Sequence, residues 1–360
     1  MNNNITRRQI LARLEENDLA YSVLNLQDGL SVVVSEYGGR IFGPFLNETG
    51  PSLTWMNQAF QDTVAFERFL AAGDWNLGGE RVWIAPEIQY NIRDRQDFWG
   101  SYTLPRQVDP GNYRLGACRD QCEMSMSLEL ECFNISSGTK ALELARTIRA
   151  VDNPLRFTDQ FRELMRNVKY CGFEHTLQLA EASTDDKLSE SWVLLQLNPG
   201  GQLYIPISPL ARVTEYYDPT DDKVCNRFDH FLRLEITGDR KYKIGVDAAG
   251  VNGRMAYINR LDKDTGYALV RNFFNNPSSV YAEEPHTRPG LKGNSVHVYN
   301  DSGRLGGFGE MECNGQTIGG TTGRSVSVDQ MALWVFVGPL ERIHEIVLYL
   351  TGIDTKTTQE

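Results

Sequence analysis

Arg81 and Trp83 are the first residues in the chain whose types and spacing could do chemistry. They lie two apart in residues 78–87, a run that reads as a strand introduced by two glycines. Side chains alternate between the faces of a strand, so both would project opposite Val82 and Ile84. An indole suits the C–H face of a sugar ring, and a guanidinium can donate to its hydroxyl groups. The pair predicts a sugar platform; the alternative is a bulge with a snorkelling arginine over a half-buried indole.

Two carboxylates near the end of the chain have the same spacing. Glu310 and Glu312 alternate with Met311 and Cys313, so both carboxylates would project from one face of a strand. Such a pair can accept hydrogen bonds from sugar hydroxyls, and either member can act as a general base. The alternative is a solvated strand face, which the usual exposure of glutamate favours.

Three histidines are candidates for the general acid. His286 lies in a loop stiffened by two prolines, between carboxylates and an arginine; the alternative is a charged surface loop. His297 alternates with Tyr299 on a predicted strand and could face the same cleft as Glu310. His175 alternates with apolar residues, so a core histidine is the alternative there.

Further residues next to these segments complete the predicted cleft. The residues that we assign to substrate binding are Arg81, Trp83, Glu87, Tyr299, Asn300 and Asp301. The sequence has no H-x-x-H spacing, no G-x-S-x-G elbow and no phosphate-binding glycine loop that opens a helix. We therefore expect neither a metal nor a cofactor.

The elements that must position these residues are predominantly strands. From Tyr21 onward, short runs of β-branched and aromatic residues alternate with Gly, Asn, Asp and Pro. This pattern predicts an all-β fold, a supersandwich of two large stacked antiparallel sheets. Residues 6–15 are the one clear predicted helix. We expect an N-terminal extension over residues 1–20 and a single β domain over residues 21–354.

Two long segments illustrate the pattern. Residues 122–133 have apolar side chains at every second position, as a half-buried strand requires. Residues 142–149 could form a helix on composition, but their apolar positions also run at period two, so we predict a strand.

The composition restricts the possible partners. The 360 residues are 41% hydrophobic and 23% charged, enough for a large core in an ordinary globular protein. A net charge of −11 argues against nucleic acid and against an anionic membrane, so neutral small molecules are the natural ligands. The first residues do not resemble a secretory signal, and the cysteines are sparse. We expect a cytoplasmic protein in which Cys118 and Cys122 are free thiols, the alternative being a metal or redox pair; its oligomeric state is open.

Several short motifs together resemble the galactose mutarotase-like superfamily, in an uncharacterised bacterial branch. The motifs are Gly38-Gly39-Arg40, Gly79-Glu80-Arg81-Val82-Trp83 with Pro86-Glu87, Ser191-Trp192 with Leu197, Tyr204-Ile205-Pro206, Tyr299-Asn300-Asp301 and Phe308-Gly309-Glu310-Met311-Glu312. The resemblance covers most of the chain after residue 20. It implies a β-supersandwich whose concave sheet face holds a sugar.

The resemblance also implies roles for individual residues. In aldose 1-epimerases, which are isomerases, a histidine protonates the ring oxygen, a late glutamate takes the anomeric proton, and an arginine orients the sugar. Arg81 matches the arginine, Glu310 or Glu312 the late glutamate, and His175 the mid-chain histidine, although Glu174 replaces the usual asparagine before it. The glycine-rich histidine motif of those enzymes is missing. The expected function is carbohydrate binding with aldose 1-epimerase-like activity; the alternative is a non-catalytic sugar-binding or sugar-sensing domain.

Overall fold

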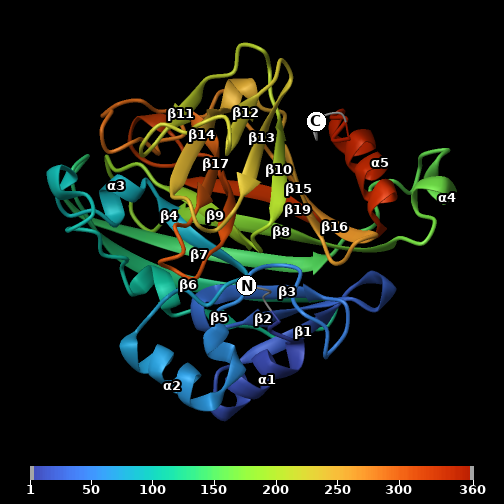
Figure 1. The fold of residues 1–360 in the computed structure, drawn as a ribbon. Helices are drawn as coiled ribbons and strands as arrows, with labels where there is room; N and C mark the ends of the chain where they lie inside the picture. Colours follow the sequence, from blue (N-terminus) through green and yellow to red (C-terminus); the bar gives the residue numbers. More distant parts are fainter. Residues whose placement is uncertain (1–3, 357–360) are drawn as a thin grey trace.

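The computed structural model describes residues 4–356, which form two large antiparallel sheets stacked on a common core (Figure 1). The first sheet has nine strands in the order β1 (Tyr21–Asn25), β2 (Ser31–Ser35), β3 (Arg40–Phe45), β4 (Glu80–Ala85), β9 (Glu190–Leu197), β18 (Gly309–Asn314), β17 (Asn294–Asn300), β14 (Tyr242–Asp247) and β11 (Val213–Glu215). The second has ten in the order β12 (Cys225–Arg227), β13 (Phe231–Ile236), β10 (Gly201–Pro206), β15 (Arg254–Arg260), β16 (Thr265–Phe273), β19 (Val326–Pro339), β8 (Lys169–Glu181), β7 (Gly138–Ala150), β6 (Gln121–Cys132) and β5 (Arg114–Leu115). The predicted all-β fold of two stacked sheets is confirmed.

The core between the sheets is built from alternate positions of the strands. On β6, Met124, Met126, Leu128 and Leu130 are buried, and every residue between them is exposed. This alternation places one face of the strand on the core and leaves the other in water. Residues 142–149 lie within β7 and follow the same rule, so the predicted strand is confirmed.

Helices cover parts of the outer faces of both sheets. An apolar cluster joins α1 (Arg7–Glu16) and α2 (Thr63–Ala72) to the outer face of β2 and β3. These strands lie near the edge of the first sheet that begins with β1 (Figure 1). On the second sheet, α5 (Leu340–Thr351) packs against β15, β16 and β19. The remaining helices, α3 (Glu87–Tyr90) and α4 (Phe161–Leu164), are each a single turn.

The helices were predicted only in part. The helix expected over residues 6–15 is confirmed, with Thr6 and Gln9 forming a capping box at its start. The expectation that it would be the one clear helix is wrong, because α2 and α5 are each as long or longer. In α5, the buried residues Ile343, Val347 and Leu350 recur at helical spacing, a signal that the run of strands before it obscured.

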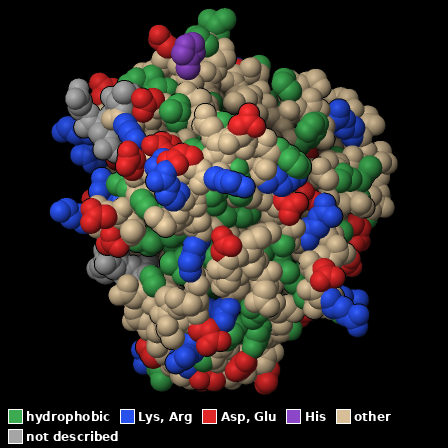
Figure 2. Space-filling view, turned by 90° about the vertical axis from the view of Figure 1, so that its right-hand side faces the viewer, with side chains coloured by type: hydrophobic (Ala, Val, Ile, Leu, Met, Phe, Trp, Pro, Cys, Tyr) green, Lys and Arg blue, Asp and Glu red, His purple; other side chains and the backbone are tan. Residues whose placement is uncertain are grey.

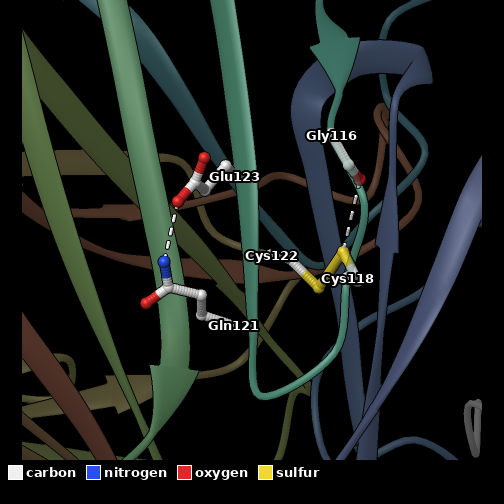
Figure 3. The surroundings of a disulfide bond; sticks show 5 residues. All are labelled: Gly116, Cys118, Gln121, Cys122 and Glu123. Atoms are coloured by element: carbon white, nitrogen blue, oxygen red, sulfur yellow. Dashed lines mark hydrogen bonds between the residues drawn. A yellow bond between two sulfur atoms is a disulfide. The ribbon is translucent and has the colours of Figure 1, made fainter.

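Cys118 and Cys122 form a disulfide at the start of β6 (Figure 3). The chain reverses direction between β5 and β6, and this turn brings the two Cα atoms to 4.4 Å. The expectation of free thiols at these positions is therefore wrong, since the spacing of the two cysteines does not reveal the turn. The free cysteines are Cys132, Cys171, Cys225 and Cys313.

One face of the molecule shows how charge is distributed on its surface. On the face that Figure 2 shows, acidic and basic side chains are interspersed and hydrophobic side chains form small separate groups. No helix within residues 4–356 is long and apolar enough to cross a membrane.

Candidate functional site

Most of the predicted site residues gather on the outer face of the first sheet, beyond the part that α1 and α2 cover. Residues directly opposite one another in antiparallel strands share a face. Three rows of such partners cross the middle of the sheet: Glu310–Tyr299–Lys243, Arg81–Leu194–Glu312–His297 and Trp83–Trp192. The predicted common face of Arg81 and Trp83 is confirmed, as is that of the two glutamates.

A cavity of about 380 Å³ lies over these rows. Its volume falls in the range of roughly 300–1,000 Å³ that is usual for small-molecule sites. The aromatic side chains that line it are Trp75, Trp83, Trp99, Tyr102, Trp192, Tyr217, Tyr299 and Phe308. The charged ones are Arg81, Lys241, Lys243, Arg304, Glu87, Asp301, Glu310 and Glu312. Aromatic walls with a few convergent charges can hold an amphipathic ring and hydrogen-bond its polar groups.

Arg81 lies on the floor of the cavity with unused donors. Its side chain is 1% exposed, and its Cζ lies 4.2 Å from the ring centroid of Trp83 and 4.9 Å from that of Trp75. Its Nη2 lies 2.8 Å from Oε1 of Glu310, whereas Nε and Nη1 have no hydrogen-bond partner among the described residues. Buried donors normally have partners, so these two point to a group that the cavity receives.

A hydrogen bond to Asp109 fixes the position of the Trp83 indole. Its Nε1 donates to Oδ2 of Asp109 at 3.0 Å, and the same oxygen accepts from Nη2 of Arg40 at 2.6 Å. Burial raises the pKa of Asp109, against the opposing charge of Arg40. The Gly38-Gly39-Arg40 run, noted in the sequence without a role, thus supplies the residue that fixes the aromatic platform.

A second charged group lies at the other end of the floor, around Lys243. Its Nζ lies 3.1 Å from Oε2 of Glu87 and 4.4 Å from the ring centroid of Trp192. Nε1 of Trp192 donates to Oε2 of Glu312 at 2.9 Å. Burial disfavours the charge on Lys243, but the carboxylates of Glu87 and Glu312 hold its pKa well above the ordinary value.

Glu310 and Glu312 differ in their surroundings although they are two residues apart. Glu310 is ion-paired with Arg81. Burial raises the pKa of Glu312 to about 8; the charge of Lys243 opposes this shift, and the carboxylates of Glu310 and Glu87 add to it. A pair of carboxylates in which one is ionised and the other protonated near neutrality can serve as base and acid.

None of the three candidate histidines, all of which are among the described residues, lines the cavity. His175 lies on β8 of the other sheet and is fully buried between the sheets. His297 faces the same way as Glu312 but is buried under Tyr216, whose hydroxyl lies 2.9 Å from its Nε2. His286 is half-buried and stacks on Phe98 behind the cavity wall.

The residues assigned to substrate binding are placed together with one exception. Arg81, Trp83, Glu87, Tyr299 and Asp301 all line the cavity. Asn300 points to the opposite face, because neighbours on a strand alternate. There its Oδ1 accepts from the backbone N–H groups of Thr237 and Gly238, and its Nδ2 donates to the carbonyl of Arg240.

Sequence reasoning missed several residues of the cavity. The sequence analysis gives Lys243 no role, although a lysine amid the apolar residues of 242–246 signals a buried charge that needs partners. Trp75, Trp99 and Tyr217 come from loops, where no periodic pattern indicates the direction of a side chain. Among the described residues, no cluster of His, Cys, Asp and Glu could hold a metal ion.

The stacked sheets and the aromatic cavity define an all-β protein with a cavity on the outer face of one sheet. The chain belongs to a family of unknown function, DUF6786, whose match extends over residues 9–360. The prediction of an uncharacterised family is thereby confirmed. No curated protein matches the chain.

Solved structures to which the chain is similar include three of low sequence identity. The Slr1438 protein from Synechocystis sp. PCC 6803 is 12% identical with a TM-score of 0.45, over 88% of this chain and 96% of that one. A putative aldose 1-epimerase from Klebsiella pneumoniae is 9% identical with a TM-score of 0.42, over 90% and 81%. The 4-alpha-glucanotransferase of Thermococcus litoralis is 8% identical with a TM-score of 0.33, over 88% and 39%.

Proposed function

We propose that the cavity binds a saccharide and that Glu310 and Glu312 exchange protons with it at the anomeric centre. The observation that carries the proposal is the pair of unpartnered donors on buried Arg81, which lies over the Trp83 ring and against the Glu310 carboxylate. A sugar ring stacked on the indole would direct a hydroxyl oxygen to these donors. The resemblance to aldose 1-epimerases agrees with this assignment.

The proposed reaction opens and closes a sugar ring. Glu310, as carboxylate, takes the proton of the anomeric hydroxyl while Glu312, as carboxylic acid, gives its proton to the ring oxygen. The bond between the anomeric carbon and the ring oxygen breaks, which leaves an open-chain aldehyde. After rotation of the aldehyde the steps reverse and the other anomer forms. Glu312 takes the role that the resemblance gave to a histidine, because no histidine within residues 4–356 lines the cavity.

The same absence supports a second candidate, a saccharide-binding protein without catalysis. In that case Arg81, Trp83 and the neighbouring aromatic residues bind the sugar, and the carboxylates only accept hydrogen bonds. The discriminating measurement is the rate of anomer exchange, followed by NMR on freshly dissolved α-anomers of hexoses and pentoses. Acceleration by the wild-type protein supports the enzyme, and binding without acceleration supports the second candidate.

Saccharide binding should change tryptophan fluorescence, because Trp75, Trp83, Trp99 and Trp192 line the cavity. We expect Arg81→Gln to weaken binding by roughly tenfold or more, since hydrogen bonds to a charged group contribute about 1.5–3 kcal/mol. Fluorescence titration of wild type and variant with the same sugar measures this difference. Arg68→Gln, at an exposed position of α2, is the matched control and should bind like wild type. Equal binding by the Arg81 and Arg68 variants would contradict the proposed orientation.

The rate of anomer exchange should depend on pH through Glu312. Its raised pKa of about 8 keeps the acid protonated at neutral pH, so the catalysed rate should not fall as the pH rises to neutrality. Above that pKa the proton is lost, and the rate should fall by about tenfold per pH unit. The measurement is the catalysed rate between pH 6 and 10, after subtraction of the spontaneous rate. A rate that rises through pH 8 would instead assign Glu312 as the base.

A further inference from the structure

The mouth of the cavity carries two cations that have no ion-pair partner among the described residues. Lys241 and Arg304 line the cavity, and both are exposed. Neither forms an ion pair with any residue between 4 and 356. Nζ of Lys241 lies 3.1 Å from the ring centroid of Trp99 and 5.1 Å from that of Tyr217, so its close partners among the described residues are aromatic rings. Burial and the positive charge of Arg304 lower the pKa of Lys241, so the two cations repel each other; the carboxylates of Asp301, Glu87 and Asp218 oppose this shift, but none of them lies within ion-pair distance.

The charges deeper in the cavity are arranged differently. Arg81 pairs with Glu310, and Lys243 pairs with Glu87. Asp301, the acidic residue next to the mouth, is occupied by its own loop: its Oδ2 accepts from the backbone N–H groups of Leu305 and Gly307. Lys241 and Arg304 therefore remain without an ion-pair partner among the described residues after the internal pairs form, in a protein whose net charge is −11.

The two loops that carry these cations are tied together. Asn300 holds the turn before Lys241 through its bonds to Gly238 and Arg240. Asp301 shapes the loop that carries Arg304. The loops touch so closely that a Cβ added to Gly238 would lie 2.7 Å from the carbonyl carbon of Gly307. Two cations held on packed loops form a prepared position for an anion.

We propose that the saccharide carries an anionic group, a carboxylate or a phosphate ester, which binds between Lys241 and Arg304 while the sugar ring stacks on the aromatic floor. This inference rests on the proposed function, because it names the class of saccharide. A guanidinium and an ammonium suit both kinds of anion, the first by paired hydrogen bonds and the second as a point charge.

The test compares matched sugars on the same protein. The probes are glucose and galactose, the uronate and the 6-phosphate of each, and inorganic phosphate alone, titrated by tryptophan fluorescence. For wild type we expect at least one anionic sugar to bind roughly ten- to hundredfold more tightly than its neutral parent. In Lys241→Met/Arg304→Gln this ratio should fall close to one, whereas Lys241→Arg/Arg304→Lys should retain most of it. Whether the uronate or the phosphate shows the effect identifies the anion.

The outcomes separate this inference from the proposed function. Equal binding of neutral and anionic sugars contradicts the proposal of an anionic group but not the proposal of a saccharide site. Binding of inorganic phosphate as tight as that of the sugar phosphate overturns it too, since the mouth would then be an anion site without a sugar. If Lys241→Met/Arg304→Gln still prefers the anionic sugar, other residues cause the preference, and the assignment of Lys241 and Arg304 to the anion is wrong. Binding of none of the probes overturns both proposals.

Discussion

Glu80→Gln should lower the free energy of unfolding by about 3–5 kcal/mol, the usual cost of removing one partner of a buried ion pair. Glu80 lies on β4 between Arg81, which faces the cavity, and the glycines that precede the strand, and it points to the opposite face. Its side chain is fully buried between the sheets. The glutamine has nearly the same shape, so the expected loss comes from the charge and not from packing.

The partners of Glu80 come from the other sheet. It forms an ion pair with Arg271 on β16, and its Oε1 lies 3.0 Å from Nδ1 of His175 on β8. Nε of Arg146 donates to Nε2 of the same histidine at 2.9 Å, so the ring proton lies on Nδ1 and is donated to Glu80. Burial would raise the pKa of Glu80, but Arg271 and His175 lower it to about 2. Without the carboxylate, two buried guanidinium groups lose their counter-charge.

The measurement is urea denaturation of wild type and variant at neutral pH. Glu174→Gln is the matched control: this neighbour of His175 makes a solvent-exposed ion pair with Arg149, and its loss should cost less than about 1 kcal/mol. The double variant Glu80→Met/Arg271→Met should recover part of the stability, since an apolar pair replaces the ion pair and only Arg146 then lacks a counter-charge. Equal losses for Glu80→Gln and Glu174→Gln would show that the buried cluster contributes no more than a surface pair.

Local patterns in the sequence predicted part of the fold, but they could not predict long-range contacts such as those of Glu80. Alternation along one strand depends only on local geometry, so the buried face of β6 and the strand assignment of residues 142–149 followed from the sequence. The partners of Glu80 lie 95 and 191 residues away, and no local pattern joins them. The turn that pairs Cys118 with Cys122 and the packing of α5 likewise depend on neighbouring strands.

Some residues of the candidate site could likewise be placed from the sequence, and others could not. Arg81 with Trp83, and Glu310 with Glu312, could be placed on common faces because each pair is two apart on one strand. His297 was placed on the correct face, but the burial under Tyr216 is a tertiary contact that its strand does not encode. Asn300 was assigned to the cleft with its neighbours, although alternation along the strand directs it away from them. The loop residues that complete the cavity could not be inferred without the fold.

Glu310→Gln and Glu312→Gln should each lower the catalysed rate of anomer exchange by roughly hundredfold or more, the usual contribution of a general acid or base. Glutamine at position 312 can still accept the hydrogen bond from Trp192, and glutamine at position 310 keeps a polar group beside Arg81, but neither can exchange a proton. Saccharide binding should therefore change much less than the rate. The two measurements are exchange NMR for the rate and tryptophan fluorescence for binding.

The pH profiles of the two variants assign the two roles. If Glu312 is the acid, Glu312→Gln loses the fall in rate above its raised pKa, whereas the residual rate of Glu310→Gln keeps it. Glu129→Gln, on the exposed face of β6, is the control and should match wild type in both assays. A wild-type protein that binds the sugar without accelerating exchange, and variants that alter only the affinity, would contradict acid–base catalysis. Arg81, Trp83 and the two carboxylates would then form a binding site, because the same hydrogen bonds need no proton transfer.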